Sequence, residues 1–157
     1  MKKFLSIIAI VLVAATLFTG CMLIPIRRNF SQYGVYFTIA GNVTEKEGNK
    51  YGDAVFYTTL GTFHFERMYN ILSGSLLGAD NIIAVAAATY NTTPRTLKNG
   101  ASYFTYDAGE NSSGNKVIGL AYAIQVGSAV WAITCTAREG KFNRESIINA
   151  CMSAEFC

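Results

Sequence analysis

The chain has 157 residues, of which 51% are hydrophobic, and a net charge of +3 at pH 7, which fits one folded domain. Its 13 Lys and Arg residues are scattered, which argues against nucleic acid binding, because that function normally needs a concentrated basic face. A single histidine excludes a metal site built from several histidines, and the sequence indicates no cofactor.

The first 21 residues have the pattern of an export signal. Two lysines precede an apolar run from Phe4 to Phe18, and two small residues, Thr19 and Gly20, lead to Cys21. Residues 17–21 resemble the lipobox of bacterial lipoproteins, although Leu17 lies one position further from the cysteine than the family pattern has it. The resemblance implies cleavage after residue 20 and a lipid anchor on Cys21.

The same segment also fits an uncleaved transmembrane anchor. The 23 residues from Phe4 to Ile26 are uncharged, and about 20 apolar residues suffice to span a bilayer. Pro25 and the Gly20-Cys21 pair favour cleavage. Both interpretations tether the domain outside the cytoplasm. In a cell with two membranes, the lack of Asp directly after Cys21 resembles the pattern of lipoproteins sent to the outer membrane.

We therefore expect a signal peptide over 1–20, a lipid anchor and tether over 21–32, and a single α+β domain over 33–157. Without its signal peptide the chain has 137 residues, with 11 Lys and Arg against 10 Asp and Glu. Residues 27–32 are polar and basic, which suits either a solvated linker or a segment that lies on anionic lipid headgroups.

The predicted domain begins with a strand over 33–40, followed by a charged loop over 42–53 and a second strand over 54–59. Residues 82–90 predict another strand, 91–100 a loop, 101–107 an aromatic strand and 109–115 a turn or loop. Between them, residues 62–77 predict a helix, because apolar residues recur there at helical spacing. These residues are Phe65, Met68, Tyr69, Leu72 and Leu76.

A hairpin over residues 117–137 is the clearest local pattern. Gly127 and Ser128 suit a two-residue type II′ turn, which places Val126 opposite Ala129. This register sorts the side chains by size. The large ones share one face: Ile118, Leu120, Tyr122, Ile124, Trp131, Ile133 and Cys135. The small ones share the other, which suits either a closely packed helix or solvent: Gly119, Ala121, Ala123, Ala132 and Thr134.

The C-terminal segment predicts a helix. Asn143 is suited to cap it, Glu145 lies in its first turn, and Phe142 and Ile147 have the spacing of a hydrophobic staple. Its predicted apolar side packs on the sheet and comprises Ile147, Ile148, Cys151, Met152 and Phe156.

This order of elements predicts an α+β fold: an antiparallel sheet of about six strands, one helix after the second strand and a C-terminal helix packed on the sheet. The stretch from Leu97 to Tyr103, the hairpin and the helix over 142–156 resemble the PsbP-like α/β/α sandwich, which would cover residues 35–156. That resemblance implies a non-enzymatic binding or assembly module, and no functional residue is carried over from it.

The cysteines pose a separate question. With Cys21 lipidated, Cys135, Cys151 and Cys157 remain in an oxidising compartment. The hairpin places Cys135 on the large face and the helix places Cys151 on its buried side, so a disulfide between them is one hypothesis. A Cys151–Cys157 bond and three reduced thiols are the alternatives.

Two functions remain open. The first is a membrane-tethered binding or assembly module, which contacts an envelope protein or glycan through aromatic side chains such as Tyr103 and Tyr106. The second is a small envelope hydrolase that uses His64 with a nearby carboxylate, Glu66 or Asp53, which would require a concave pocket in which these groups converge. We favour the non-enzymatic module, because no catalytic motif accompanies His64.

Overall fold

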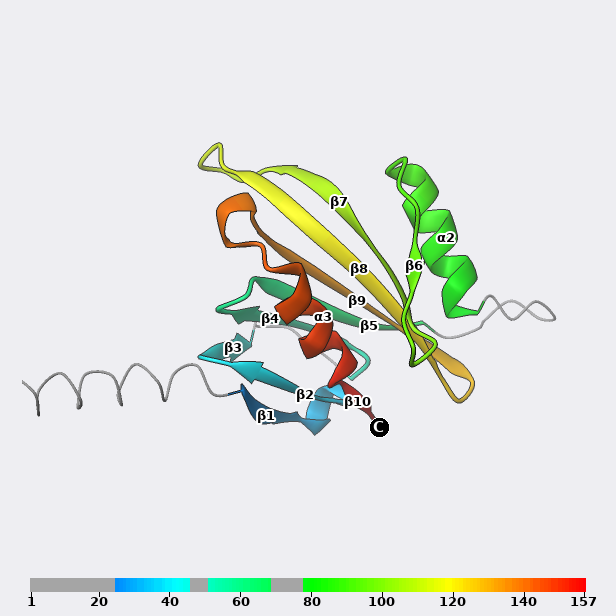
Figure 1. Cartoon of the computed structure of the whole chain (residues 1–157). Helices are drawn as coiled ribbons and strands as arrows, with labels where there is room; N and C mark the ends of the chain where they lie inside the picture. The colour runs from blue at the N-terminus through cyan, green and yellow to red at the C-terminus, as the bar shows by residue number, and fades with distance from the viewer. Residues whose placement is uncertain (1–24, 46–50, 69–77) are drawn as a thin grey trace, which may run out of the picture.

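The computed structural model describes residues 25–45, 51–68 and 78–157 (Figure 1). One sheet contains β1 (Pro25–Phe30), β2 (Val35–Ala40) and β10 (Glu155–Phe156). The other contains β3 (Val43–Glu45), β4 (Asp53–Thr58), β5 (Thr62–Met68), β6 (Arg95–Thr96), β7 (Ser102–Glu110), β8 (Lys116–Val126) and β9 (Ala129–Arg138). The helical elements are the α-helices α2 (Ala79–Thr89) and α3 (Arg144–Met152) and the 3-10 turns η1 (Ser31–Tyr33) and η2 (Glu139–Lys141).

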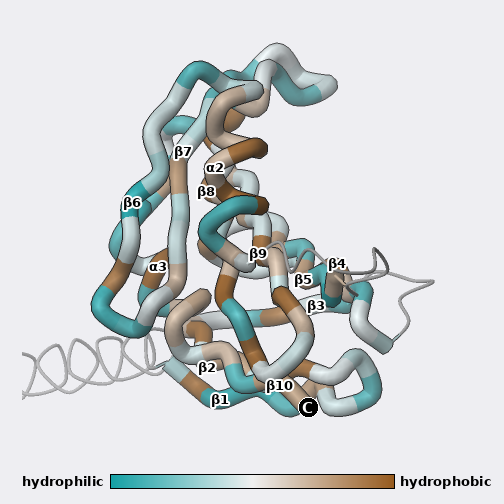
Figure 2. The backbone as a smooth tube through the Cα atoms, turned by 90° about the vertical axis from the view of Figure 1, so that its right-hand side faces the viewer, coloured by the Kyte–Doolittle hydropathy of each residue, from teal (hydrophilic) through white to brown (hydrophobic). Residues whose placement is uncertain are grey.

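The strands pair antiparallel in two sheets, which confirms the predicted α+β class. The three-stranded sheet has the order β1-β2-β10, and the seven-stranded sheet has the order β3-β4-β5-β9-β8-β7-β6. In the view of Figure 2, β1, β2 and β10 lie together at the bottom, while α2 and β7 lie in the upper part. Among the residues described, no helix is long and apolar enough to cross a membrane, and residues 1–24, with the predicted signal and Cys21, lie outside them.

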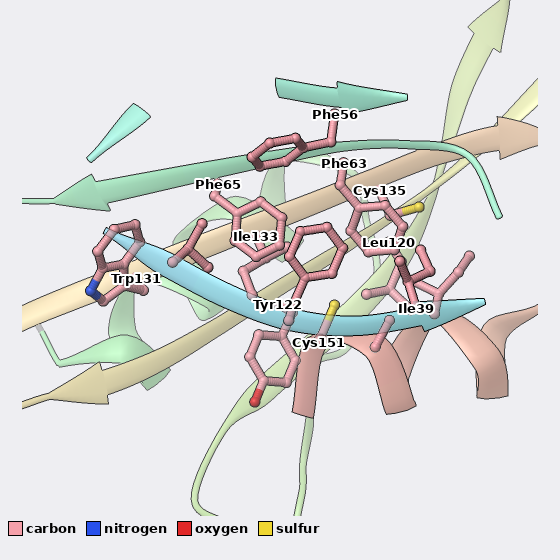
Figure 3. Packing of buried hydrophobic residues seen from close by; sticks show 14 of the residues in the cluster. Ile39, Phe56, Phe63, Phe65, Leu120, Tyr122, Trp131, Ile133, Cys135 and Cys151 are labelled. Atoms are coloured by element: carbon pink, nitrogen blue, oxygen red, sulfur yellow. The ribbon is translucent and has the colours of Figure 1, made fainter. Parts of the chain in front are cut away.

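The main core lies between the seven-stranded sheet on one side and the three-stranded sheet with α3 on the other (Figure 3). Alternate residues of the strands point into it, as the period of a strand requires. Phe37 of β2, Phe56 of β4 and Phe63 and Phe65 of β5 are fully buried, and their rings contact one another at centroid distances of 5.0–6.2 Å. These rings join the two sheets.

The hairpin of β8 and β9 has the predicted register. Val126 lies opposite Ala129 and Tyr122 opposite Ile133, and Gly127 has a φ of +59°, as the first central position of a type II′ turn requires. The large face belongs to the main core. Helix α2 covers the β8 side of the small face, where Ala121 and Ala123 form a second core with that helix.

The helix that covers the small face is the segment predicted as a strand. Residues 79–89 form α2, whose Ile83 and Ala87 pack on the sheet with Ala121 and Ala123 of β8. The alanines of this segment favour a helix more than its β-branched residues favour a strand. The buried Ser102 hydroxyl donates a hydrogen bond to the carboxylate of Asp80 and fixes the first turn of α2 on β7.

The helix predicted for residues 62–77 is also wrong over its first part. Residues 62–68 form β5, which pairs with β4 on one side and β9 on the other, and 69–77 lie outside the described residues. As a strand, this segment gains backbone hydrogen bonds on both sides, and it buries Phe63 and Phe65 on one face while His64 and Glu66 lie on the other. These gains outweigh the helical spacing of its apolar residues.

The N-terminal boundary of the domain lies earlier than predicted. Residues 25–30 pair with β2 along its whole length, and the ring of Phe30 packs in the main core. Arg27 forms an ion pair with Glu155, at 2.6 Å, and Arg28 donates a hydrogen bond to the carbonyl of Gly41. The polar side chains that predicted a spacer therefore belong to an edge strand.

The C-terminal helix forms as predicted but ends earlier. The Asn143 side chain accepts a hydrogen bond from the backbone N–H of Ser146 at 3.0 Å, which confirms the N-cap. Ile147 and Cys151 are buried as predicted, but Met152, where the helix stops, is exposed. Phe156 lies beyond the helix, where it pairs with β2 in β10 and stacks on Trp131.

Candidate functional site

The two tyrosines predicted for a binding surface point to opposite faces of β7. Tyr103 is 8% exposed and lies in the main core, so the predicted exposure is wrong for this residue. Tyr106, three positions later, lies above Gly119 on the outer face, where its ring centroid is 4.4 Å from that of Tyr90. The reason is geometric, because residues an odd number of positions apart in a strand point to opposite faces.

His64 lies on the outer face of the seven-stranded sheet with a carboxylate partner. Its Nε2 is 2.8 Å from Oδ1 of Asp53, and the two side chains are 40% and 48% exposed. Glu66 lies opposite Asp53 across the β4–β5 ladder. Within the described ranges, no hydroxyl or thiol is hydrogen-bonded to His64, and no cluster of three His, Cys, Asp or Glu side chains is arranged to hold a metal ion.

The three cysteines that the structure describes, Cys135, Cys151 and Cys157, are free thiols, so the hypothesised Cys135–Cys151 disulfide is not formed. Both side chains do lie in the main core, as the hairpin register and the helix pattern predicted (Figure 3). Burial raises the pKa of Cys135 to about 12, and burial together with the nearby Cys135 raises the pKa of Cys151 well above its ordinary value. Cys157 is exposed.

Part of the outer face of the sheet is left open. Helix α2 covers the side of β7 and β8, whereas the outward side chains of β4 and β5 remain wholly or partly exposed. We call these side chains the open face, and they comprise Asp53, Val55, Tyr57, Thr62, His64 and Glu66. Tyr57 is 49% exposed and gives this face an accessible aromatic ring.

A polar cavity of about 500 Å³ lies at one end of the open face. Tyr57, Thr62 and Thr136 lie side by side across β4, β5 and β9 in its wall, and Arg138 and Lys141 complete the wall. Among the described residues, no Asp or Glu lines it, and neither cation has an ion-pair partner. The cavity therefore presents hydroxyl groups and unpaired positive charge.

The acidic residue nearest in sequence to these cations has another partner. The ammonium group of Lys116 is 3.4 Å from Glu139 and 3.7 Å from Asp107, and the hydrogen bond and charge of Glu139 raise the pKa of Lys116. Glu139 thus pairs with Lys116 and does not neutralise Arg138 and Lys141.

A second cavity, of about 360 Å³, is mainly apolar and lies between β2, α3 and the turn from β4 to β5. Ser153 in its wall has satisfied hydrogen bonds, because its hydroxyl accepts from the Thr38 N–H at 2.8 Å and donates to the Ala150 carbonyl at 2.7 Å. Leu60, in the turn from β4 to β5, lines both this apolar cavity and the polar one. The other lining residues are Pro25, Ile39, Ala40, Ser146 and Asn149.

No protein-family model and no curated protein matches this chain. Solved structures with a similar fold are known. A protein from Bacteroides thetaiotaomicron matches over 78% of this chain with 14% identity and a TM-score of 0.56, and this chain spans 45% of its length. The Ran-binding protein Mog1p from Saccharomyces cerevisiae matches over 85% of this chain and 96% of its own, with 7% identity and a TM-score of 0.53. These likenesses show a shared fold.

A cyanobacterial PsbP protein, CyanoP from Synechocystis, covers 86% of this chain at 10% identity, and this chain covers 94% of it. The TM-score is 0.47, so the likeness is weak, and the fold class rests on the topology described above.

Proposed function

We propose that this protein is a non-enzymatic binding or assembly module of a bacterial cell envelope, tethered to a membrane through lipidated Cys21. The open face carries the proposal, because it presents an accessible ring, Tyr57, beside polar side chains and a cavity. Among the residues that the structure describes, no hydroxyl or thiol is hydrogen-bonded to His64. Mog1p, which has the same fold, is a Ran-binding protein, so this architecture is compatible with a binding role.

The His64–Asp53 pair is better suited to binding than to hydrolysis. The two groups lie on strands at the surface, and other residues line both the polar and the apolar cavity described above. A general base activates a nucleophile when a hydroxyl or thiol lies within hydrogen-bond reach, and within residues 25–45, 51–68 and 78–157 neither group is bonded to His64. The pair instead offers the second imidazole nitrogen of His64 and the second carboxylate oxygen of Asp53 to a partner.

The tether is tested by the intact mass of the protein extracted from membranes. A chain that begins at Cys21 and carries acyl mass supports the lipoprotein. A chain that begins at Met1 contradicts lipidation and identifies the uncleaved anchor.

The binding surface is tested by placing a photoreactive amino acid at Tyr57 in the full chain and irradiating intact cells. Met152, exposed on α3, provides the control position. We expect a defined adduct with an envelope protein or glycan from position 57 that is absent from position 152. No adduct from position 57, or the same adducts from both positions, would contradict the proposal.

A further inference from the structure

The two cavities lie at the same end of the domain as the first described residue. Pro25 lines the apolar cavity, and Leu60, in the turn between β4 and β5, lines both that cavity and the polar one. In Figure 1 this is the left end of the molecule, where β1 begins and where the turns that follow β4 and β7 and the 3-10 turn before α3 also lie. The opposite end carries the β8–β9 turn.

The distance from Cys21 to this end is short. Four residue steps separate Cys21 from Pro25, so whatever its conformation this segment spans at most about 14 Å. Because β1 starts at Pro25, no long tether separates the proposed lipid anchor from the folded domain. An uncleaved transmembrane helix ending near residue 24 would bring Pro25 equally close to the bilayer.

The chemistry of the two cavities matches an anionic phospholipid. One cavity is mainly apolar and suits an acyl chain, whereas the other presents threonine hydroxyls with Arg138 and Lys141, which suit a phosphate group. We propose that this end of the domain docks on the bilayer and binds an anionic phospholipid, with one acyl chain in the apolar cavity and the phosphate beside Arg138 and Lys141. This inference rests on the membrane tether of the proposed function.

A photoreactive amino acid in the full, membrane-extracted chain tests this docking after reconstitution into phospholipid nanodiscs. Position 149 is suitable, because Asn149 is exposed and lines the apolar cavity. Position 128 is the matched control, because Ser128 is exposed in the β8–β9 turn at the opposite end. The discs contain phosphatidylcholine alone or a mixture with phosphatidylglycerol. We expect lipid adducts from position 149 that increase with phosphatidylglycerol, and none from position 128.

Charge-matched variants test the polar cavity. Replacing Arg138 and Lys141 by glutamine should lower the yield of phosphatidylglycerol adduct roughly twenty-five-fold, since each cation near an anionic surface contributes about a fivefold factor. Replacing Arg95 and Lys98 by glutamine removes the same charge from exposed positions outside both cavities and should leave the yield unchanged.

The failures can be told apart. Three results with a wild-type chain that stays in the discs would overturn the phospholipid site and leave the tether standing. These are no lipid adduct from position 149, equal adduct yields from positions 149 and 128, and equal yields in both disc types. Equal losses in the two charge variants overturn the role of Arg138 and Lys141. A chain that washes out of the discs contradicts the tether and, with it, the docking.

Discussion

The position of Gly119 has no room for a side chain, because the ring of Tyr106 lies directly above it. A Cβ at this position would overlap the ring of Tyr106, which packs against the ring of Tyr90. The sequence predicted the small face of the hairpin but not the Tyr106 ring that lies above it. No local sequence pattern indicated which residues of β7 would pair with β8.

We expect Gly119→Ala to destabilise the protein by about 1–3 kcal/mol, because the Tyr106 ring must move away from its present position. Urea denaturation measures the change. Gly140→Ala is the control, since nothing lies within 4 Å of the Cβ it would add. Equal unfolding midpoints for wild type and Gly119→Ala would contradict the packing argument.

The buried thiols allow a second test at the scale of single residues. Thiolates are the reactive form, and burial raises the pKa of Cys135 to about 12 and that of Cys151 well above its ordinary value, so both stay protonated at pH 8. With Cys21 acylated, a thiol reagent should modify only exposed Cys157 rapidly in the folded protein. After unfolding without reductant it should modify three cysteines; a single modified cysteine would show that a disulfide exists.

At the scale of secondary-structure elements, helix α2 packs closely on the small face of the hairpin. The face is smooth because Ala121 and Ala123 lie on it, and α2 approaches with its own small residue, Ala87. Close packing of this kind leaves no room for a larger side chain on the covered part of the sheet.

We expect Ala123→Leu to cost about 1–3 kcal/mol, because Ala123 is fully buried under α2. Ala132→Leu is the matched control. Ala132 lies directly opposite Ala123 in the ladder and on the same face, but it is only partly buried and not part of the α2 core. Circular dichroism and urea denaturation compare the two variants, and equal losses of stability would contradict a specific fit of α2.

Elements with local signals were predictable from the sequence, and elements defined by their neighbours were not. The β8–β9 turn, the hairpin register and the Asn143 cap depend on residues close in sequence, and all three are confirmed. Strand β5 carries apolar residues that fit both a strand and a helix, and its pairing with β4 and β9 decides between them. The cavities combine residues from segments far apart in the sequence, so no sequence motif predicted them.

At the scale of the whole molecule, the first strand decides where the domain begins. The Phe30 ring packs at 5.5 Å from that of Phe37 and 4.3 Å from that of Phe56, so residues 25–30 contribute to the main core as well as to the sheet. The arginines at positions 27 and 28 led to the prediction of a polar linker in place of a strand. An edge strand tolerates such charged side chains.

A soluble chain that starts at residue 33, the predicted boundary, should be less stable than one that starts at residue 25. The loss of Phe30 alone should cost about 3–5 kcal/mol, and the exposed edge of β2 should promote aggregation. Urea midpoints and size-exclusion chromatography compare the two chains. Equal midpoints would contradict the assignment of β1 to the domain.

The position of β10 has a consequence for the order in which the chain completes its fold. Strand β2 is paired on one side by β1 and on the other by β10, the N–H of Cys157 donates to the carbonyl of Gly34, and the Tyr51 hydroxyl donates to the Cys157 carbonyl. The final residues of the chain thus complete the sheet that the first described residues begin. A chain that is synthesised from its N-terminus cannot finish this sheet until residues 155–157 are free to pair with β2, so the pairing of β1 with β2 precedes the closure of the domain.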